Sequence, residues 1–202
     1  MKKKIKIYLC DLTYDTVLLV SDTIPINIGF IASYIKKYLN NETEITLYKY
    51  PDSAIEMIKK EPPDMIALSN YSWNSNLSEH VASIAKKYNP NVVTTQGGTN
   101  FPHKTVQQKK FIQKRPYTDI FTLFEGERAL LNVVKRILES NLDRNKIFDL
   151  PIDGCVFIHP DTKNLSDDKQ LFVVGETLTR IKDLDEIPSP YLNGILDKFF
   201  DG

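Results

Sequence analysis

The chain has 202 residues, of which 42% are hydrophobic and 26% are charged. This composition predicts one folded globular domain with a small extension, and it argues against disorder. The 26 basic residues balance the 26 acidic ones. A protein that grips phosphate backbones carries a basic excess, so nucleic acid is not expected as a partner.

Two cysteines, Cys10 and Cys155, lie in strand-like apolar segments and form no CxxC motif. This pattern gives no sign of a disulfide framework, so we expect a reducing, cytoplasmic location. The N-terminal lysines pass directly into the alternating Ile5-Lys6-Ile7, which is typical of a strand and not of a signal peptide. No apolar stretch reaches the length of a membrane span, so no membrane association is expected.

Strand and helix patterns alternate five times from residue 5 to residue 138. Pro51 and Asp52 precede the second helix, with Asp52 expected as its N-cap. Apolar strands separated by amphipathic helices predict an α/β fold, Rossmann-like and flavodoxin-like. The expected sheet is doubly wound, five-stranded and parallel, in the order 2-1-3-4-5. Strands are expected at 5–12, 44–50, 65–69, 92–95 and 120–124, and helices at 28–39, 53–60, 77–88, 106–113 and 127–138.

The pattern changes after residue 140. Segments 153–158 and 170–174 predict two strands around a turn-rich stretch, which indicates a small β-hairpin appendage. A proline-punctuated connector follows from residue 180. The expected division is therefore a sheet domain at 1–140, the hairpin at 141–179 and a linker at 180–202.

The loops that follow the strands are the candidate binding residues, because ligands of parallel sheets bind at the carboxyl ends of strands. Glycines there leave backbone bare, and Trp73 offers a flat apolar wall to a planar cofactor. The alternative for Trp73 is packing under the next helix, and Glu127 can equally favour a helix N-terminus. The candidates are Thr13, Pro25 and Asn27; Ser69, Tyr71, Trp73 and Asn74; Gly97, Gly98, Thr99 and Asn100; and Glu125, Gly126 and Glu127.

The long loop at 13–27 has its own apolar core, Val17 to Val20, which we expect to be buried against the fold or a ligand. A purely structural loop is the alternative. The three histidines show no metal-ligand spacing, and no phosphate-loop or nucleophile-elbow motif is present. We therefore expect neither a metal site built by this chain nor catalytic residues of its own.

Three segments together resemble the N-terminal cobalamin-binding domain of cobalamin-dependent radical S-adenosylmethionine enzymes. They are Gln96 to Pro102 with its glycine pair, Phe124 to Leu130 with Glu-Gly-Glu, and Asp183 to Tyr191 in the connector. The resemblance implies that the domain holds the corrin ring at the carboxyl edge of its sheet, with the nucleotide tail between sheet and helix.

The resemblance also implies that a radical barrel follows Gly202. That barrel would carry a CxxxCxxC motif, a 4Fe-4S cluster and S-adenosylmethionine, in a methyltransferase or related radical enzyme. The chain itself lacks such a motif, so it is expected to be a fragment, or a protein with the binding half alone.

The chain departs from classical cobalamin-binding domains in one respect. Those domains have a DxHxxG motif after the first strand, whereas residues 11–30 contain no histidine. Our hypothesis is that Trp73 or Tyr71 lies beside the corrin instead. Asn100 stands where relatives often have a histidine, so that histidine's role does not transfer to this position.

Three other classes of protein remain as alternatives. A flavodoxin-like flavin binder would also place an aromatic residue after the third strand, but residues 13–17 lack the glycine of its phosphate loop. A receiver domain needs an aspartate where Ser69 and Asn70 stand. A partner-binding module without a cofactor is the third alternative.

Overall fold

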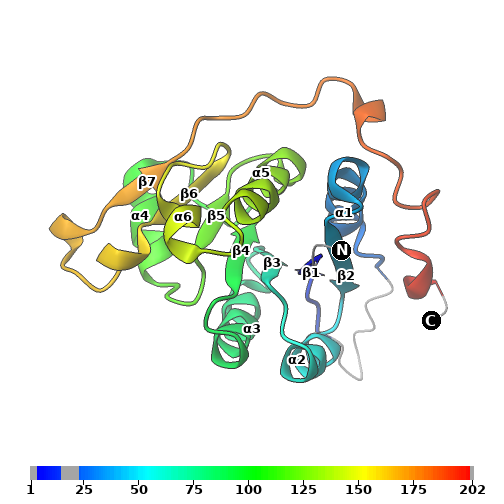
Figure 1. Cartoon of the computed structure of the whole chain (residues 1–202), viewed down its shortest axis with the longest axis horizontal. Coiled ribbons are helices and arrows are strands. Elements are labelled where there is room, and N and C mark those ends of the chain that lie inside the picture. The colour runs from blue at the N-terminus through cyan, green and yellow to red at the C-terminus, as the bar shows by residue number, and fades with distance from the viewer. Residues whose placement is uncertain (1–3, 15–22, 201–202) are drawn as a thin grey trace.

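The structure is a computed structural model that describes residues 4–14 and 23–200, and strands alternate with helices through most of it (Figure 1). The strands are β1 (Ile5–Cys10), β2 (Thr43–Tyr48), β3 (Met65–Ser69), β4 (Val93–Gly97), β5 (Ile120–Thr122), β6 (Cys155–Ile158) and β7 (Phe172–Val174). The helices are α1 (Ile26–Leu39), α2 (Pro51–Lys60), α3 (Ser75–Tyr88), α4 (Thr105–Gln113), α5 (Gly126–Glu139) and α6 (Arg144–Phe148).

The strands of the described residues form one sheet in the order β2-β1-β3-β4-β5-β6-β7. The strands from β1 to β5 are parallel, and their order, 2-1-3-4-5, confirms the expectation. The expectation of five strands with a separate hairpin was wrong. β6 pairs antiparallel with β5, and β7 pairs with β6, so the hairpin extends the sheet. The domain boundaries at residues 140 and 179 stay a prediction.

Alternation along the strands divides the core between two layers of helices. In β1, Ile5, Ile7 and Leu9 face the cluster formed with α1 and α5, whereas Tyr8 and Cys10 face the cluster formed with α2 and α3. Figure 1 shows α1 and α5 together on one side of the sheet and α2 and α3 on the other. This two-layer burial is what the apolar strands and amphipathic helices predict.

Local details refine the sequence prediction. The second helix begins at Pro51 with Tyr50 as its N-cap residue, so the expectation that Asp52 is the N-cap was wrong; Asp52 lies in the first turn. Proline suits this first position because it has no N–H to satisfy. The short helix α6 was not predicted, and its N-cap, Asp143, accepts a hydrogen bond from Asn145 N at 3.1 Å. No helix among the described residues is long and apolar enough to cross a membrane.

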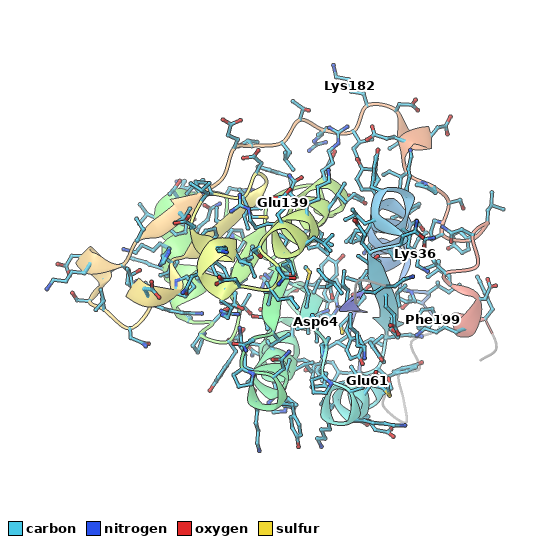
Figure 2. All side chains as sticks on the ribbon, in the orientation of Figure 1. Lys36, Glu61, Asp64, Glu139, Lys182 and Phe199 are labelled. Carbon is cyan, nitrogen blue, oxygen red and sulfur yellow. The ribbon has the colours of Figure 1, made fainter. Side chains whose placement is uncertain are left out.

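The C-terminal segment leaves β7, crosses over α5 and descends along α1 (Figure 1). Leu196 is fully buried in the cluster beneath α1. A Cβ added at Gly29 would lie 3.0 Å from Leu196, so the helix has a glycine where this segment passes closest. Figure 2 shows Phe199 beside the body of the protein and Lys182 pointing away from it.

Candidate functional site

A cavity of about 450 Å³ opens at the carboxyl edge of the parallel strands. Its floor is the sheet face under α1 and α5, and its walls include the first turns of these two helices. Its volume lies in the range of small-molecule sites. The volume is comparable to that of a nucleotide-sized ligand.

Strand register arranges the floor in two rows. Leu9, Ala67 and Thr95 form the deeper row across β1, β3 and β4. Ser69 and Gly97 are one side-chain repeat nearer the edge, about 7 Å along the strands. The cavity is therefore a slot that runs from the edge of the sheet down between sheet and helices.

The structure brings most of the predicted site residues to this slot. Those in its lining are Asn27, Ser69, Tyr71, Gly97, Gly98, Thr99, Glu125, Gly126 and Glu127. Their convergence follows from the parallel sheet, because the loops after β3, β4 and β5 leave at the same edge. Glu127 lies in the first turn of α5 as well, so both interpretations of this residue remain open.

The other five predicted residues lie outside the lining. Thr13 donates its N–H to Lys49 O at 3.0 Å, and Pro25 is buried immediately before α1. Asn100 donates its Nδ2 hydrogen to Asn70 Oδ1 at 3.3 Å, which holds the loop after β4 against that after β3. The apolar core expected at 17–20 lies outside the described residues.

Asn74 and Trp73 support the slot from its outer side. The fully buried Asn74 donates to Ser69 Oγ at 2.8 Å and to Leu12 O at 3.1 Å, and it accepts from Tyr71 N at 2.8 Å. Trp73 stacks on Tyr71 with ring centroids 4.6 Å apart. Its side chain is 64% exposed, which excludes packing under α3. The aromatic pair thus stands at the rim, one ring in the lining and one in solvent.

The glycines of the rim are required by the packing of the protein itself. Gly98 has φ +143°, and a Cβ there would lie 2.5 Å from Asn70 O. A Cβ at Gly97 would lie 2.1 Å from Thr122 Oγ1. We predicted that these glycines expose backbone to a ligand. In the structure, their lack of a side chain allows the loops after β3, β4 and β5 to approach one another.

Burial works against negative charge around the slot. It raises the pKa of Asp11, although a hydrogen bond from Ser69 opposes the shift. Burial also raises the pKa of Glu127 and of Tyr71, the latter with a contribution from the nearby Asp11 carboxylate. Burial therefore disfavours the charged forms of Asp11, Glu127 and Tyr71.

Sequence reasoning missed the apolar part of the lining, three aromatic residues and three polar ones. Phe124 has φ 55°, is 67% exposed and stacks on His103 at 6.4 Å between ring centroids. Strand alternation could have placed Thr95 on the same face as Leu9. Nothing in the sequence indicates the positive φ of Phe124. The missed lining residues are Leu9, Ile28, Ile31, Ala67, Leu68, Thr95, Phe101, His103, Gln108, Thr122, Leu123, Phe124 and Leu130.

These features define a class of protein, a doubly wound α/β cofactor-binding domain with a slot under the carboxyl edge of its sheet. Comparison with family models gives the family. The model described as B12 binding domain matches residues 16–134, and the chain belongs to this family. The resemblance noted in the sequence is therefore confirmed, and the chain is a cobalamin-binding domain.

Curated relatives are longer enzymes. Over 135 residues the chain is 32% identical to the cobalamin-dependent radical SAM methyltransferase TokK of Streptomyces tokunonensis. It is 29% identical, also over 135 residues, to the 2-(S-pantetheinyl)-carbapenam-3-carboxylate methyltransferase of Streptantibioticus cattleyicolor. Each match covers 67% of this chain but 17% of the relative, so the chain aligns with only a small part of each.

A solved structure agrees on the fold. The cobalamin-dependent S-adenosylmethionine radical enzyme OxsB, with aqua-cobalamin and S-adenosylmethionine bound, superposes with a TM-score of 0.65. The match covers 98% of this chain and 26% of OxsB at 18% identity. The C-terminal strands and linker are thus included in the shared fold.

Proposed function

We propose that this domain holds cobalamin with the nucleotide tail in the slot and the corrin ring outside it, at the carboxyl edge of the sheet. The slot itself is the observation that carries the proposal. It has the size of a nucleotide, it opens at the edge, and it lies between sheet and helices, where the resemblance to cobalamin-binding domains puts the tail. The fully buried Thr95, whose hydroxyl lacks a partner among the described residues, and the apolar floor suit an organic base.

The rim residues would meet the ring. Tyr71 lines the slot, and the exposed Trp73 stacks on it. A corrin ring at the edge would therefore have this aromatic pair beside one of its faces. Bound cobalamin would supply a cobalt centre able to carry a methyl group. The chain's own residues bind and orient the cofactor and shield the face against which they lie.

We further propose that the whole protein is a radical S-adenosylmethionine methyltransferase or a related radical enzyme. The support is the description of TokK and OxsB, together with the connector that follows the sheet. The 4Fe-4S cluster and S-adenosylmethionine would belong to a barrel domain after residue 202. A cytoplasmic location would agree with the two buried free thiols.

Titration with hydroxocobalamin tests the binding mode. Trp73 is the only tryptophan in the chain, so its fluorescence reports on the rim. We expect saturable quenching, and we expect Trp73→Ala to weaken binding, followed by the visible spectrum, by about 10-fold. Tyr117→Ala removes an exposed aromatic residue immediately before β5, at the opposite edge, and should leave the affinity unchanged. Equal affinity of Trp73→Ala and the parent would contradict the placement of the ring.

A further inference from the structure

The hydroxyl group of Thr95 is an unexplained polar atom at the deep end of the slot. Thr95 is fully buried, lines the cavity, and has no hydrogen-bond partner for Oγ1 among the described residues. Buried hydroxyl groups in folded proteins are nearly always hydrogen-bonded. A ligand atom that accepts a hydrogen bond at this depth would satisfy the group.

Three other polar side chains of the lining already make hydrogen bonds within the protein. Asn27 donates to Tyr71 Oη at 2.6 Å, and Ser69 Oγ accepts from Asn74 at 2.8 Å. Gln108 donates to Pro102 O at 2.9 Å. These contacts fix the walls near the rim. Thr95 differs from these three residues because its hydroxyl group is fully buried and makes no hydrogen bond among the described residues.

The surroundings of Thr95 are apolar. Its neighbours in the deeper row are Leu9 and Ala67, and α1 and α5 contribute Ile28 and Leu130 from the opposite wall. Leu9 is fully buried, and Ile28 and Leu130 are each 4% exposed. The deep end of the slot thus offers one hydrogen-bond donor inside an apolar enclosure.

The order of groups in a cobamide decides what reaches this end. The nucleotide tail runs from the corrin through phosphate and ribose to a base, so with the ring at the edge the base lies deepest. A 5,6-dimethylbenzimidazole that is not bound to cobalt has one ring nitrogen free to accept, and its methyl groups are apolar. An adenine base carries an amino group and more ring nitrogens, which an apolar wall would leave without partners.

We propose that Thr95 and the apolar row beside it select cobamides with a benzimidazole base over those with an adenine base. Thr95 Oγ1 donates to the free ring nitrogen, and Leu9, Ala67, Ile28 and Leu130 enclose the methylated edge. This inference rests on the proposed placement of the nucleotide tail in the slot. It makes Thr95 a specificity-determining residue of the cofactor site.

Parallel titrations of the 202-residue chain with cobalamin and with adeninylcobamide, followed by visible absorbance, test the inference. We expect cobalamin to bind about 10-fold tighter or more. Thr95→Val keeps the shape of the side chain and removes the donor, so it should weaken cobalamin binding about 3- to 10-fold and affect adeninylcobamide less. Thr46→Val, the same change on β2 outside the slot, should alter neither affinity.

Folding can be separated from binding in the same variants. Thr95→Val removes an unsatisfied buried hydroxyl, so its urea midpoint without cofactor should equal or exceed that of the parent. Equal affinity of the parent for both cobamides would overturn the inference and leave cobalamin binding intact. So would a Thr95→Val variant that binds cobalamin as tightly as the parent. Failure to bind either cobamide would contradict the proposed binding mode and, with it, this inference.

Discussion

Tyr34 of α1 donates a hydrogen bond to Glu186 Oε1 in the C-terminal segment, with 2.7 Å between the two oxygens. Arg128 of α5 reaches the same carboxylate, with Nη2 3.0 Å from Oε2. Glu186 therefore bridges the two helices that form the walls of the slot. Ile181 adds an apolar contact with Tyr34 and Leu131 a few residues earlier. The connector is therefore packed against the cofactor-binding domain.

Replacing Glu186 with alanine should release the connector from α1 and α5. Lys182, four residues before Glu186, points into solvent (Figure 2), so trypsin cleavage after Lys182 measures how often the segment detaches. We expect severalfold faster cleavage in Glu186→Ala. The exposed neighbour gives the control, because Asp185→Ala should be cleaved at the parental rate. Unchanged cleavage of Glu186→Ala would show that the bridge does not hold the connector.

Gly98 should tolerate alanine poorly. Its φ of +143° is unfavourable for any residue with a side chain, and the new Cβ would lie 2.5 Å from backbone oxygen of Asn70. We expect Gly98→Ala to lower the free energy of unfolding by about 1–3 kcal/mol, measured by urea denaturation. At Gly126 the same Cβ would meet the flexible end of Ile31 at 3.0 Å. Gly126→Ala should therefore cost less stability, and an equal loss would argue against backbone strain at Gly98.

The sequence predicted the parallel part of the sheet well because short apolar or β-branched segments alternate there with helical patterns. Met65–Ser69 is buried at every position, which is the pattern of a central strand. The attachment of β6 to β5 was not predictable in the same way. It depends on the short edge formed by Phe121 and Thr122, which pairs with Val156 and Cys155 although α5 and α6 lie between them in the chain. Local patterns carry no information on such distant pairing.

The residues at the rim of the slot could be predicted from the sequence, whereas those at its deep end could not. Gly97, Gly98 and Gly126 stand out in a chain with eight glycines. Leu9 and Ala67, by contrast, have the same pattern as core residues, and only the register of three strands brings them beside Thr95. An unpartnered hydroxyl is visible only when all neighbouring groups are placed. Tertiary packing determines which residues line the deep end of a pocket, and the sequence pattern does not specify that packing.

Ionisation of the buried Asp119 makes the free energy of unfolding depend on pH in the acid range. Its buried carboxylate binds Arg144 Nη2 at 3.0 Å, accepts from Thr94 N at 3.0 Å and pairs with Lys86. Burial alone would raise its pKa, but Lys86 and Arg144 outweigh burial and hold the pKa below its ordinary value. The unfolded chain therefore takes up the proton first as pH falls. The stabilisation of the folded state by the ionised Asp119 carboxylate is therefore complete above about pH 4 and is lost as the pH falls below it.

Asp119→Asn should remove this stabilisation. It leaves two cations near a neutral group, so at pH 7 we expect the free energy of unfolding to fall by about 3–5 kcal/mol. The difference from the parent should shrink as pH is lowered from 5 toward 2, measured by urea denaturation at each pH. Asp149→Asn, at an exposed carboxylate five residues after Arg144, should change little. A difference that stays constant with pH would contradict an ionised Asp119 in the folded protein.

Asn74→Ala should disturb the aromatic pair without touching either ring. The fully buried amide makes three hydrogen bonds, to Ser69, to Leu12 O and from Tyr71 N. We expect a loss of about 1–3 kcal/mol in unfolding free energy and a weaker near-ultraviolet circular dichroism signal from the stacked Tyr71 and Trp73. Cobalamin affinity should fall with that signal at temperatures where the variant is folded. The exposed Asn76→Ala is the matched control, and parental affinity in Asn74→Ala would separate the aromatic pair from cofactor binding.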